Sequence, residues 1–164
     1  MYVFQRVKVS AHAVQPPLPG KPSDLFLASV PIPLVLNTVH LGVQLSSSLS
    51  WSAHIAGLVR HVAFKVYLIK RLAYHSGAAN VAKRLYLGLV RPVLEYAGPV
   101  WDSCTKADCL AVERVQLFLA RASLRCSHRS TSNVDVLSII GWPTLAWRRR
   151  RFKRLLLWHL LHGG

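Results

Sequence analysis

Hydrophobic positions in the middle of the chain recur with the period of an α-helix. At about 100° per residue they fall within one stripe about 100° wide. The stripe consists of Ile55, Leu58, Val59, Val62, Val66 and Ile69. The opposite face carries Arg60, Tyr67 and Arg71. The pattern predicts an amphipathic helix that begins near Ser52 and ends near Tyr74–Gly77, where Gly77 is a suitable stop.

A second helix is predicted from Asn80 to about Tyr96. Asn80 is suited to cap its start, because the side chain accepts a hydrogen bond from an early backbone N–H. Pro92 is expected to kink or split this helix, since proline removes a backbone donor and crowds the preceding turn. The expected apolar face consists of Ala82, Leu85, Tyr86, Leu89, Val90 and Val93.

Further helices are predicted in the C-terminal half. The first spans Thr105–Arg125, and a short one follows Ser130–Ser132 and ends at Gly141. The last spans Pro143–His162, where Pro143 and the adjoining Thr mark a helix start. In the first of these helices the expected core positions are Val112, Val115, Leu119 and Ala122.

The N-terminal 50 residues follow a different pattern. Residues 1–24 are punctuated by Pro and are predicted to be an extended lead-in. Residues 25–50 are predicted to be a β element, with strands at Leu25–Ser29, Leu34–Asn37 and Val39–Leu45. The Val-Pro-Ile-Pro stretch is expected to be a turn or an edge, because Pro cannot donate to a ladder. With a basic helical region at 51–164, the expected fold is mainly α: a thumb-like helical bundle with a short N-terminal β-hairpin or strand element.

Charge sets this chain apart from an ordinary globular domain. It has 21 Lys and Arg against 6 Asp and Glu, a formal net charge of +15. Nucleic acid and anionic membrane are the two partners that such an excess favours. The hydrophobic fraction of 52% is too high for a disordered basic tail. We therefore expect a folded chain with an anionic partner.

Two further features bear on location. A mostly apolar run begins at Leu25, but Pro31 and Pro33 inside it would leave helix carbonyls unpaired in lipid, so no transmembrane span is expected. The three cysteines are an odd number, which favours a reduced setting inside the cell, in the nucleus or cytoplasm. Cys104 and Cys109 lack a second close pair, so no metal site is predicted.

Several ordered blocks of the sequence are similar to one family. They are HLGVQLSSSLSWSAHI (40–55), LYLGLVRPVLEYAGPVWD (85–102), VERVQLFLARA (112–122), Gly141-Trp142 and RRRRFKRLLLWHLLHG (148–163). Together they resemble the region after the palm in reverse transcriptases of LINE-type (non-LTR) retrotransposons of the Jockey and chicken-repeat kinds. The resemblance covers about residues 25–164 and implies the C-terminal thumb and connection part of an RNA-directed DNA polymerase.

The resemblance implies a binding role without the catalytic site. The intact enzyme holds RNA template and DNA primer against its palm and uses divalent metal, Mg²⁺, bound by carboxylates that include an adjacent Asp-Asp pair. No two acids are adjacent here; they are Asp24, Glu95, Asp102, Asp108, Glu113 and Asp135. We therefore expect a fragment with no catalytic residues, no metal and no cofactor of its own, and with the missing palm and fingers as partners. It is not expected to be an enzyme alone.

Two helix faces are candidate nucleic-acid contacts. Arg114, Arg121 and Arg125 share one face of the helix at 105–125, where they are predicted to track phosphates. The alternative is a solvated face. Arg60 and Arg71, with Tyr67 between them, are predicted to form a second strip, against the alternative of ordinary surface with a half-buried Tyr.

The last helix carries a collar of basic residues. Arg148–Arg151 span about 300° around the helix axis, so they cannot share one face, and Arg150 and Arg154 are the expected outward pair. Nucleic-acid contact is predicted there, with a nuclear-localisation patch or a membrane-surface helix as alternatives. Trp residues at 51, 101 and 142 are expected to be core anchors.

Two other hypotheses about function are also compatible with the sequence. A cationic membrane-surface protein would also combine a high apolar content with a basic last helix. A non-functional relic of a retrotransposon would expose apolar faces that its lost palm once covered.

Overall fold

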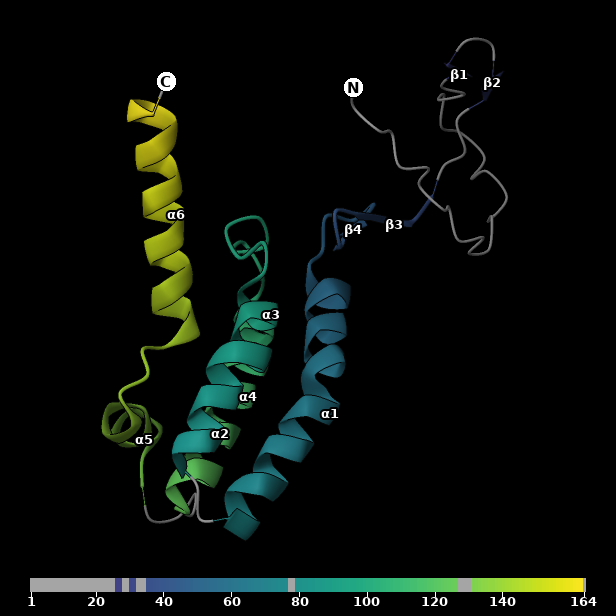
Figure 1. The fold of residues 1–164 in the computed structure, drawn as a ribbon. Coiled ribbons are helices and arrows are strands. Elements are labelled where there is room, and N and C mark those ends of the chain that lie inside the picture. The colour runs from purple at the N-terminus through teal and green to yellow at the C-terminus, as the bar shows by residue number, and fades with distance from the viewer. Residues whose placement is uncertain (1–25, 28–29, 32–34, 77–78, 127–130, 164) are drawn as a thin grey trace, which may run out of the picture.

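Helices make up most of the protein, and the predicted mainly α fold with a short N-terminal β element is confirmed (Figure 1). The computed structural model describes residues 26–27, 30–31, 35–76, 79–126 and 131–163; the expected lead-in at 1–24 lies outside them. The helices are α1 (Ser52–Ser76), α2 (Ala79–Leu85), α3 (Arg91–Glu95), α4 (Lys106–Leu124), α5 (Asn133–Ile140) and α6 (Leu145–His162). Helices α1 and α4 pack against each other, α2 contacts both, and α6 extends away from the bundle.

The strands form two small antiparallel ribbons. β1 (Phe26–Leu27) pairs with β2 (Val30–Pro31), so the expected edge position of Pro31 is found in a two-stranded ribbon. β3 (Asn37–His40) pairs with β4 (Val43–Ser46). In the strand predicted at Leu34–Asn37, Val35 and Leu36 lie outside any strand, so β3 begins later than the sequence pattern predicts.

A tight turn divides the strand predicted at Val39–Leu45, and that prediction is wrong. Leu41 and Gly42 both have positive φ, of 48° and 77°, and join β3 to β4 as a two-residue hairpin loop. Positive φ is unusual for Leu. The Tyr96 hydroxyl donates to the Leu41 carbonyl oxygen at 2.7 Å and ties this turn to the helical region.

Helix α1 places its predicted stripe against the bundle. Ile55, Val62 and Ile69 are buried, while the other three predicted positions are partly buried. The Trp51 indole donates to Ser103 Oγ at 2.9 Å and fixes the start of α1 beside the start of α4.

The predicted second helix is interrupted where Pro92 requires it. A π-helical turn, η1 (Tyr86–Val90), lies between α2 and α3, and the Arg91 N–H donates to the Tyr86 carbonyl oxygen. The wider turn accommodates a proline that lacks a donor and would crowd the carbonyl four residues earlier. Asn80 lies inside α2, which begins at Ala79. The N-cap predicted at Asn80 is therefore wrong.

The starts of the last three helices follow one rule. The hydroxyls of Thr105, Ser132 and Thr144 each accept a hydrogen bond from the backbone N–H three residues later, at 3.1 to 3.2 Å. Helices α4 and α5 end at residues with left-handed φ, Arg125 at 54° and Gly141 at 73°. These local signals explain why the predicted bounds agree with the structure to within a residue or two.

Aromatic side chains join the helices in the core. Trp101 and Trp142 are buried, as predicted, and Trp51 is partly buried against the same core. The Tyr86 ring stacks on Trp142 with ring centroids 4.2 Å apart. Its hydroxyl donates to Gln116 Oε1 at 2.5 Å, and burial raises the pKa of Tyr86 far above its usual range, so the donor stays protonated.

Removing the Tyr86 hydroxyl is expected to destabilise the bundle. Tyr86→Phe leaves the buried Gln116 oxygen without this donor, which should cost about 1–3 kcal/mol of unfolding free energy. Urea unfolding followed by circular dichroism measures the loss. The matched control is Tyr96→Phe, where the lost bond lies at the surface and the expected cost is under about 1 kcal/mol. Equal costs would show that burial of this bond is unimportant.

Candidate nucleic-acid interface

One exposed face of α1 combines cationic and aromatic side chains. It consists of Arg60, Phe64, Tyr67, Arg71 and Tyr74, which we call the α1 stripe. At about 100° per residue these positions fall within about 80° of one another, opposite the buried positions. The aromatic members are 69%, 56% and 60% exposed in sequence order, and both Arg side chains are exposed. At about 1.5 Å per residue the stripe is roughly 21 Å long.

Negative charge is absent from this face. Helix α1 contains no Asp or Glu. The carboxylates in the described ranges are engaged elsewhere: Glu95 and Asp102 pair with cations at the base of α6, and the Asp108, Glu113 and Asp135 carboxylates accept hydrogen bonds at helix starts. Within those ranges no carboxylate pairs with Arg60 or Arg71. The positive charge of the stripe is therefore left for an external anion.

The C-terminal half of α1 gathers further cations. The Lys70 ammonium lies 5.0 Å from the centre of the Phe118 ring on α4. The Arg125 guanidinium donates to the Tyr74 carbonyl oxygen at 3.2 Å and brings the end of α4 to the end of α1. A shallow hollow between the side chains is lined by Tyr67, Lys70, Arg71 and Tyr74. This end of the stripe thus combines a hollow with neighbouring cations, Lys70 and Arg71.

The predicted rail of arginines on α4 is not one exposed surface. Arg114 is exposed, and Arg125 is exposed at the helix end. Arg121, by contrast, is buried, and its guanidinium donates to the Thr131 carbonyl oxygen at 3.0 Å and to Asn133 Oδ1 at 2.8 Å. Arg121 therefore joins α4 to the start of α5. The segment that covers Arg121 comes from later in the chain, so helix periodicity alone does not predict its burial.

Arg121 and Arg114 are expected to give opposite results on substitution. Arg121→Ala removes charged hydrogen bonds to Thr131 and to Asn133 at the start of α5. The loss should cost about 1.5–3 kcal/mol of unfolding free energy. Arg114→Ala should leave stability within about 0.5 kcal/mol, because the side chain is at the surface. Thermal unfolding of both variants checks this. A stable Arg121→Ala chain would contradict the structural role.

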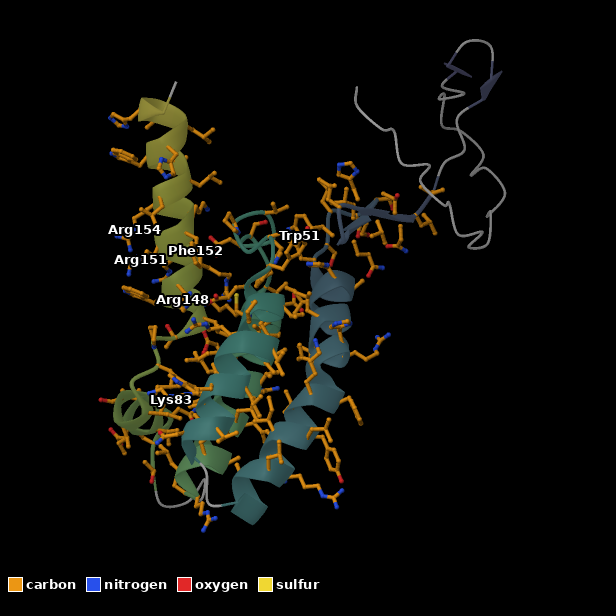
Figure 2. The ribbon with its side chains drawn as sticks, viewed as in Figure 1. Trp51, Lys83, Arg148, Arg151, Phe152 and Arg154 are labelled. Atoms are coloured by element: carbon orange, nitrogen blue, oxygen red, sulfur yellow. The ribbon has the colours of Figure 1, made fainter. Side chains whose placement is uncertain are left out.

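The basic collar of α6 divides into an inner and an outer half. On the inner side Arg148 forms a two-point ion pair with Glu95, and this hydrogen bonding raises the pKa of Arg148 against the opposing effect of burial. Arg150 and Arg154 are exposed, as expected of the outward pair. Figure 2 shows Arg151 and Arg154 on the outer side of α6 and Arg148 on the side toward the bundle.

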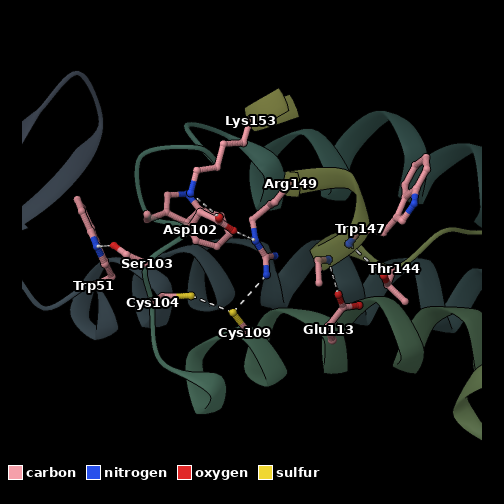
Figure 3. A network of polar contacts seen from close by, with 12 residues as sticks. Trp51, Asp102, Ser103, Cys104, Cys109, Glu113, Thr144, Trp147, Arg149 and Lys153 are labelled. Carbon is pink, nitrogen blue, oxygen red and sulfur yellow. Dashed lines mark hydrogen bonds and ion pairs between the residues drawn. The ribbon is translucent and has the colours of Figure 1, made fainter. Parts of the chain in front are cut away.

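A buried cation anchors the base of α6, and no sequence signal identified it. Arg149 is 2% exposed; its guanidinium carbon lies 4.8 Å from the Trp101 ring centre, and Nε lies 3.6 Å from Asp102 Oδ1. Asp102 also pairs with Lys153 at 3.3 Å. Figure 3 shows Arg149 and Lys153 both reaching Asp102, which lies in the loop before α4. The run of four Arg thus has a structural member at its centre.

The tip of α6 is apolar and uncovered by other described residues. From Phe152 to Leu161 every side chain is exposed. The apolar ones are Phe152, Leu155, Leu156, Leu157, Trp158, Leu160 and Leu161. No helix in the described part of the chain is long and apolar enough to cross a bilayer. The described residues also contain no group of three His, Cys, Asp or Glu arranged to hold a metal.

These features define a basic helical bundle with an exposed cationic and aromatic helix face. Comparisons of the chain with protein-family models, with curated proteins and with solved structures give no match.

Proposed function

We propose that this chain binds nucleic acid through the α1 stripe, as the thumb-like part of a LINE-type reverse transcriptase that holds RNA template and DNA primer. The observation that carries the proposal is the combination of exposed Arg and aromatic side chains on one acid-free helix face. The sequence blocks described above support the ancestry.

The stripe supplies two kinds of contact. Arg60 and Arg71 offer guanidinium groups to phosphates, and Phe64, Tyr67 and Tyr74 offer ring faces to sugars and unpaired bases. Such contacts position a strand without reading its sequence. The proposed ligand is therefore an RNA–DNA hybrid with a single-stranded RNA overhang, bound with little sequence preference. The exposed Arg114, Arg125, Arg150 and Arg154 would add phosphate contacts around it.

In the intact enzyme, palm and fingers domains would adjoin this chain, and the chain alone would not polymerise nucleotides. The β3–β4 ribbon exposes Val39 at 62% and Leu41 at 77%. Palm and fingers segments of the intact enzyme would cover this apolar edge. The carboxylates of the described residues are engaged at helix starts or with the cations of α6, which supports a binding role without catalysis. A primer-extension assay with Mg²⁺ should show no nucleotide incorporation; incorporation would contradict this part of the proposal.

A second candidate function is supported by α6. Its exposed tip is apolar on all sides and contains Trp158, and the outer cations of its collar lie one to two turns before it. A helix of this kind suits the interface of an anionic membrane, with the tip among acyl chains and the collar at the headgroups. If this second function holds, the basic collar would bind lipid phosphate instead of nucleic acid.

One competition experiment separates the two candidates. The purified chain is bound to a fluorescent RNA–DNA hybrid with an RNA overhang, and vesicles of phosphatidylserine and phosphatidylcholine are then added. The proposed function predicts tight hybrid binding that vesicles do not displace and no vesicle leakage. Displacement with leakage would favour the membrane function. An insoluble chain, or one that binds neither, would favour a non-functional relic.

A further inference from the structure

At the start of α4, two cysteines occupy the two positions whose side chains normally pack against each other across a helix cap. Thr105 is the N-cap residue, so Cys104 precedes the cap and Cys109 is the fourth residue of the helix. The Thr105 hydroxyl accepts from the Asp108 N–H at 3.2 Å and contacts the Asp108 carboxylate at 2.7 Å. With this capping arrangement, side chains just before the cap and at the fourth helical position pack against each other. Two apolar residues normally occupy them.

The sulfur atoms are in direct contact. Cys104 Sγ lies 3.0 Å from Cys109 Sγ, and both side chains are half-buried (Figure 3). A disulfide bond requires about 2.05 Å, so closure needs a movement of about 1 Å. The third cysteine, Cys126, follows the other end of α4, roughly 23 Å away at about 1.5 Å per residue. It cannot compete for either partner while α4 is folded.

We propose that Cys104 and Cys109 form a reversible disulfide that covalently closes the start of α4. This inference is independent of nucleic-acid binding and does not rest on it. The helix cap holds the two thiols together before any oxidation, so closure costs little additional chain entropy. The bond would form beside α6, because the Arg149 guanidinium donates to Cys109 Sγ at 3.3 Å. Oxidation would thus act at the contact that anchors α6.

The chemistry requires a low-molecular-weight disulfide, such as oxidised glutathione. One protein thiolate attacks it, forming a mixed disulfide and releasing one glutathione thiolate. The second cysteine sulfur, on losing its proton, attacks the mixed disulfide and releases the second glutathione. Two electrons and two protons pass from the cysteines to two glutathione thiols.

Closure is expected to be slow at neutral pH and faster at alkaline pH. Burial, followed by the contact with Cys109, raises the pKa of Cys104 to about 12. The thiolate is the attacking form, so its population grows as the pH rises toward that value.

The full chain should be tested in glutathione buffers of increasing oxidised fraction. Trypsin cuts after Lys106, between the two cysteines, so the bond is seen as a link between the peptides Leu85–Lys106 and Ala107–Arg114. We expect this link, with a mass about 2 Da below the sum of the two reduced peptides. The oxidised chain should melt several degrees higher than the reduced chain.

Two controls make the outcome decisive. Cys126→Ser should keep the link, and Cys104→Ser should abolish it and leave only a glutathione adduct. The ratio of linked to reduced form should be at least about tenfold higher in the native chain than in urea, because the cap positions the thiols. An equal ratio, or stable glutathione adducts on Cys104 and Cys109 without a link, would overturn the proposal. The pair would then be only a small apolar contact.

Discussion

Replacing Arg60 and Arg71 together with Ala is expected to weaken binding of the RNA–DNA hybrid roughly tenfold and to flatten its salt dependence. Each phosphate contact releases condensed counterions, so losing two should reduce the slope of log affinity against log salt by about 1.4 to 1.8. Both side chains are exposed and unpaired with any described carboxylate, so the loss should fall on binding and not on folding. A fluorescence anisotropy titration at several salt concentrations measures the slope.

The control for this prediction removes the same charge elsewhere. Arg84 on α2 and Lys106 on α4 are exposed and lie outside the α1 stripe. The Arg84→Ala/Lys106→Ala variant has the same net charge as the Arg60→Ala/Arg71→Ala variant. If both variants lost the same slope, binding would follow total charge, and the α1 stripe would have no special role.

Replacing Asp102 with Asn is expected to destabilise the protein more than any surface change. Asn has nearly the same shape, but it leaves Arg149 buried without its ion-pair partner, and Nε and Nη1 of that side chain already lack hydrogen-bond partners. An uncompensated buried charge typically costs about 3–5 kcal/mol. For a chain of this size that lowers Tm by roughly 6–20 °C. Calorimetry on the full chain measures the shift.

Two further variants identify the cause of this loss. Lys153→Met removes the exposed partner of Asp102 and should cost under about 1 kcal/mol, because exposed pairs contribute little. Adding Arg149→Met to Asp102→Asn should recover part of the stability, since it removes the unpaired charge. No recovery in the double variant would mean that Asp102 acts through some contact other than Arg149.

The helices follow from local signals, and each exception has an identifiable physical cause. Hydroxyl caps and left-handed stops lie within a few residues of the ends they define, so Thr105, Ser132 and Gly141 predicted helix bounds from sequence. The β3–β4 turn escaped prediction because Leu rarely adopts positive φ, and a partner 55 residues away, Tyr96, holds it there. Pro92 predicted an interruption, but not that a π-helical turn would absorb it.

Residues of the candidate site could be predicted from sequence only where the periodicity of a helix determines which side chains are exposed. The face of α1 opposite its buried stripe could be placed from sequence, with Arg60, Tyr67 and Arg71 on it. Arg121 and Arg149 could not be placed, because their neighbours come from distant segments: Arg121 bonds residues after the end of α4, and Arg149 meets Trp101. Periodicity tells which residues share a helix face, and only the packing of other segments tells whether solvent reaches it.

The most direct test of nucleic-acid binding by the α1 stripe is photo-crosslinking of the chain to an RNA–DNA hybrid with an RNA overhang, mapped by mass spectrometry. The proposed contact predicts crosslinks at Phe64, Tyr67 or Tyr74, lost when salt is raised enough to release the hybrid. Crosslinks confined to α6, or no crosslinks under conditions where the hybrid is bound, would contradict it.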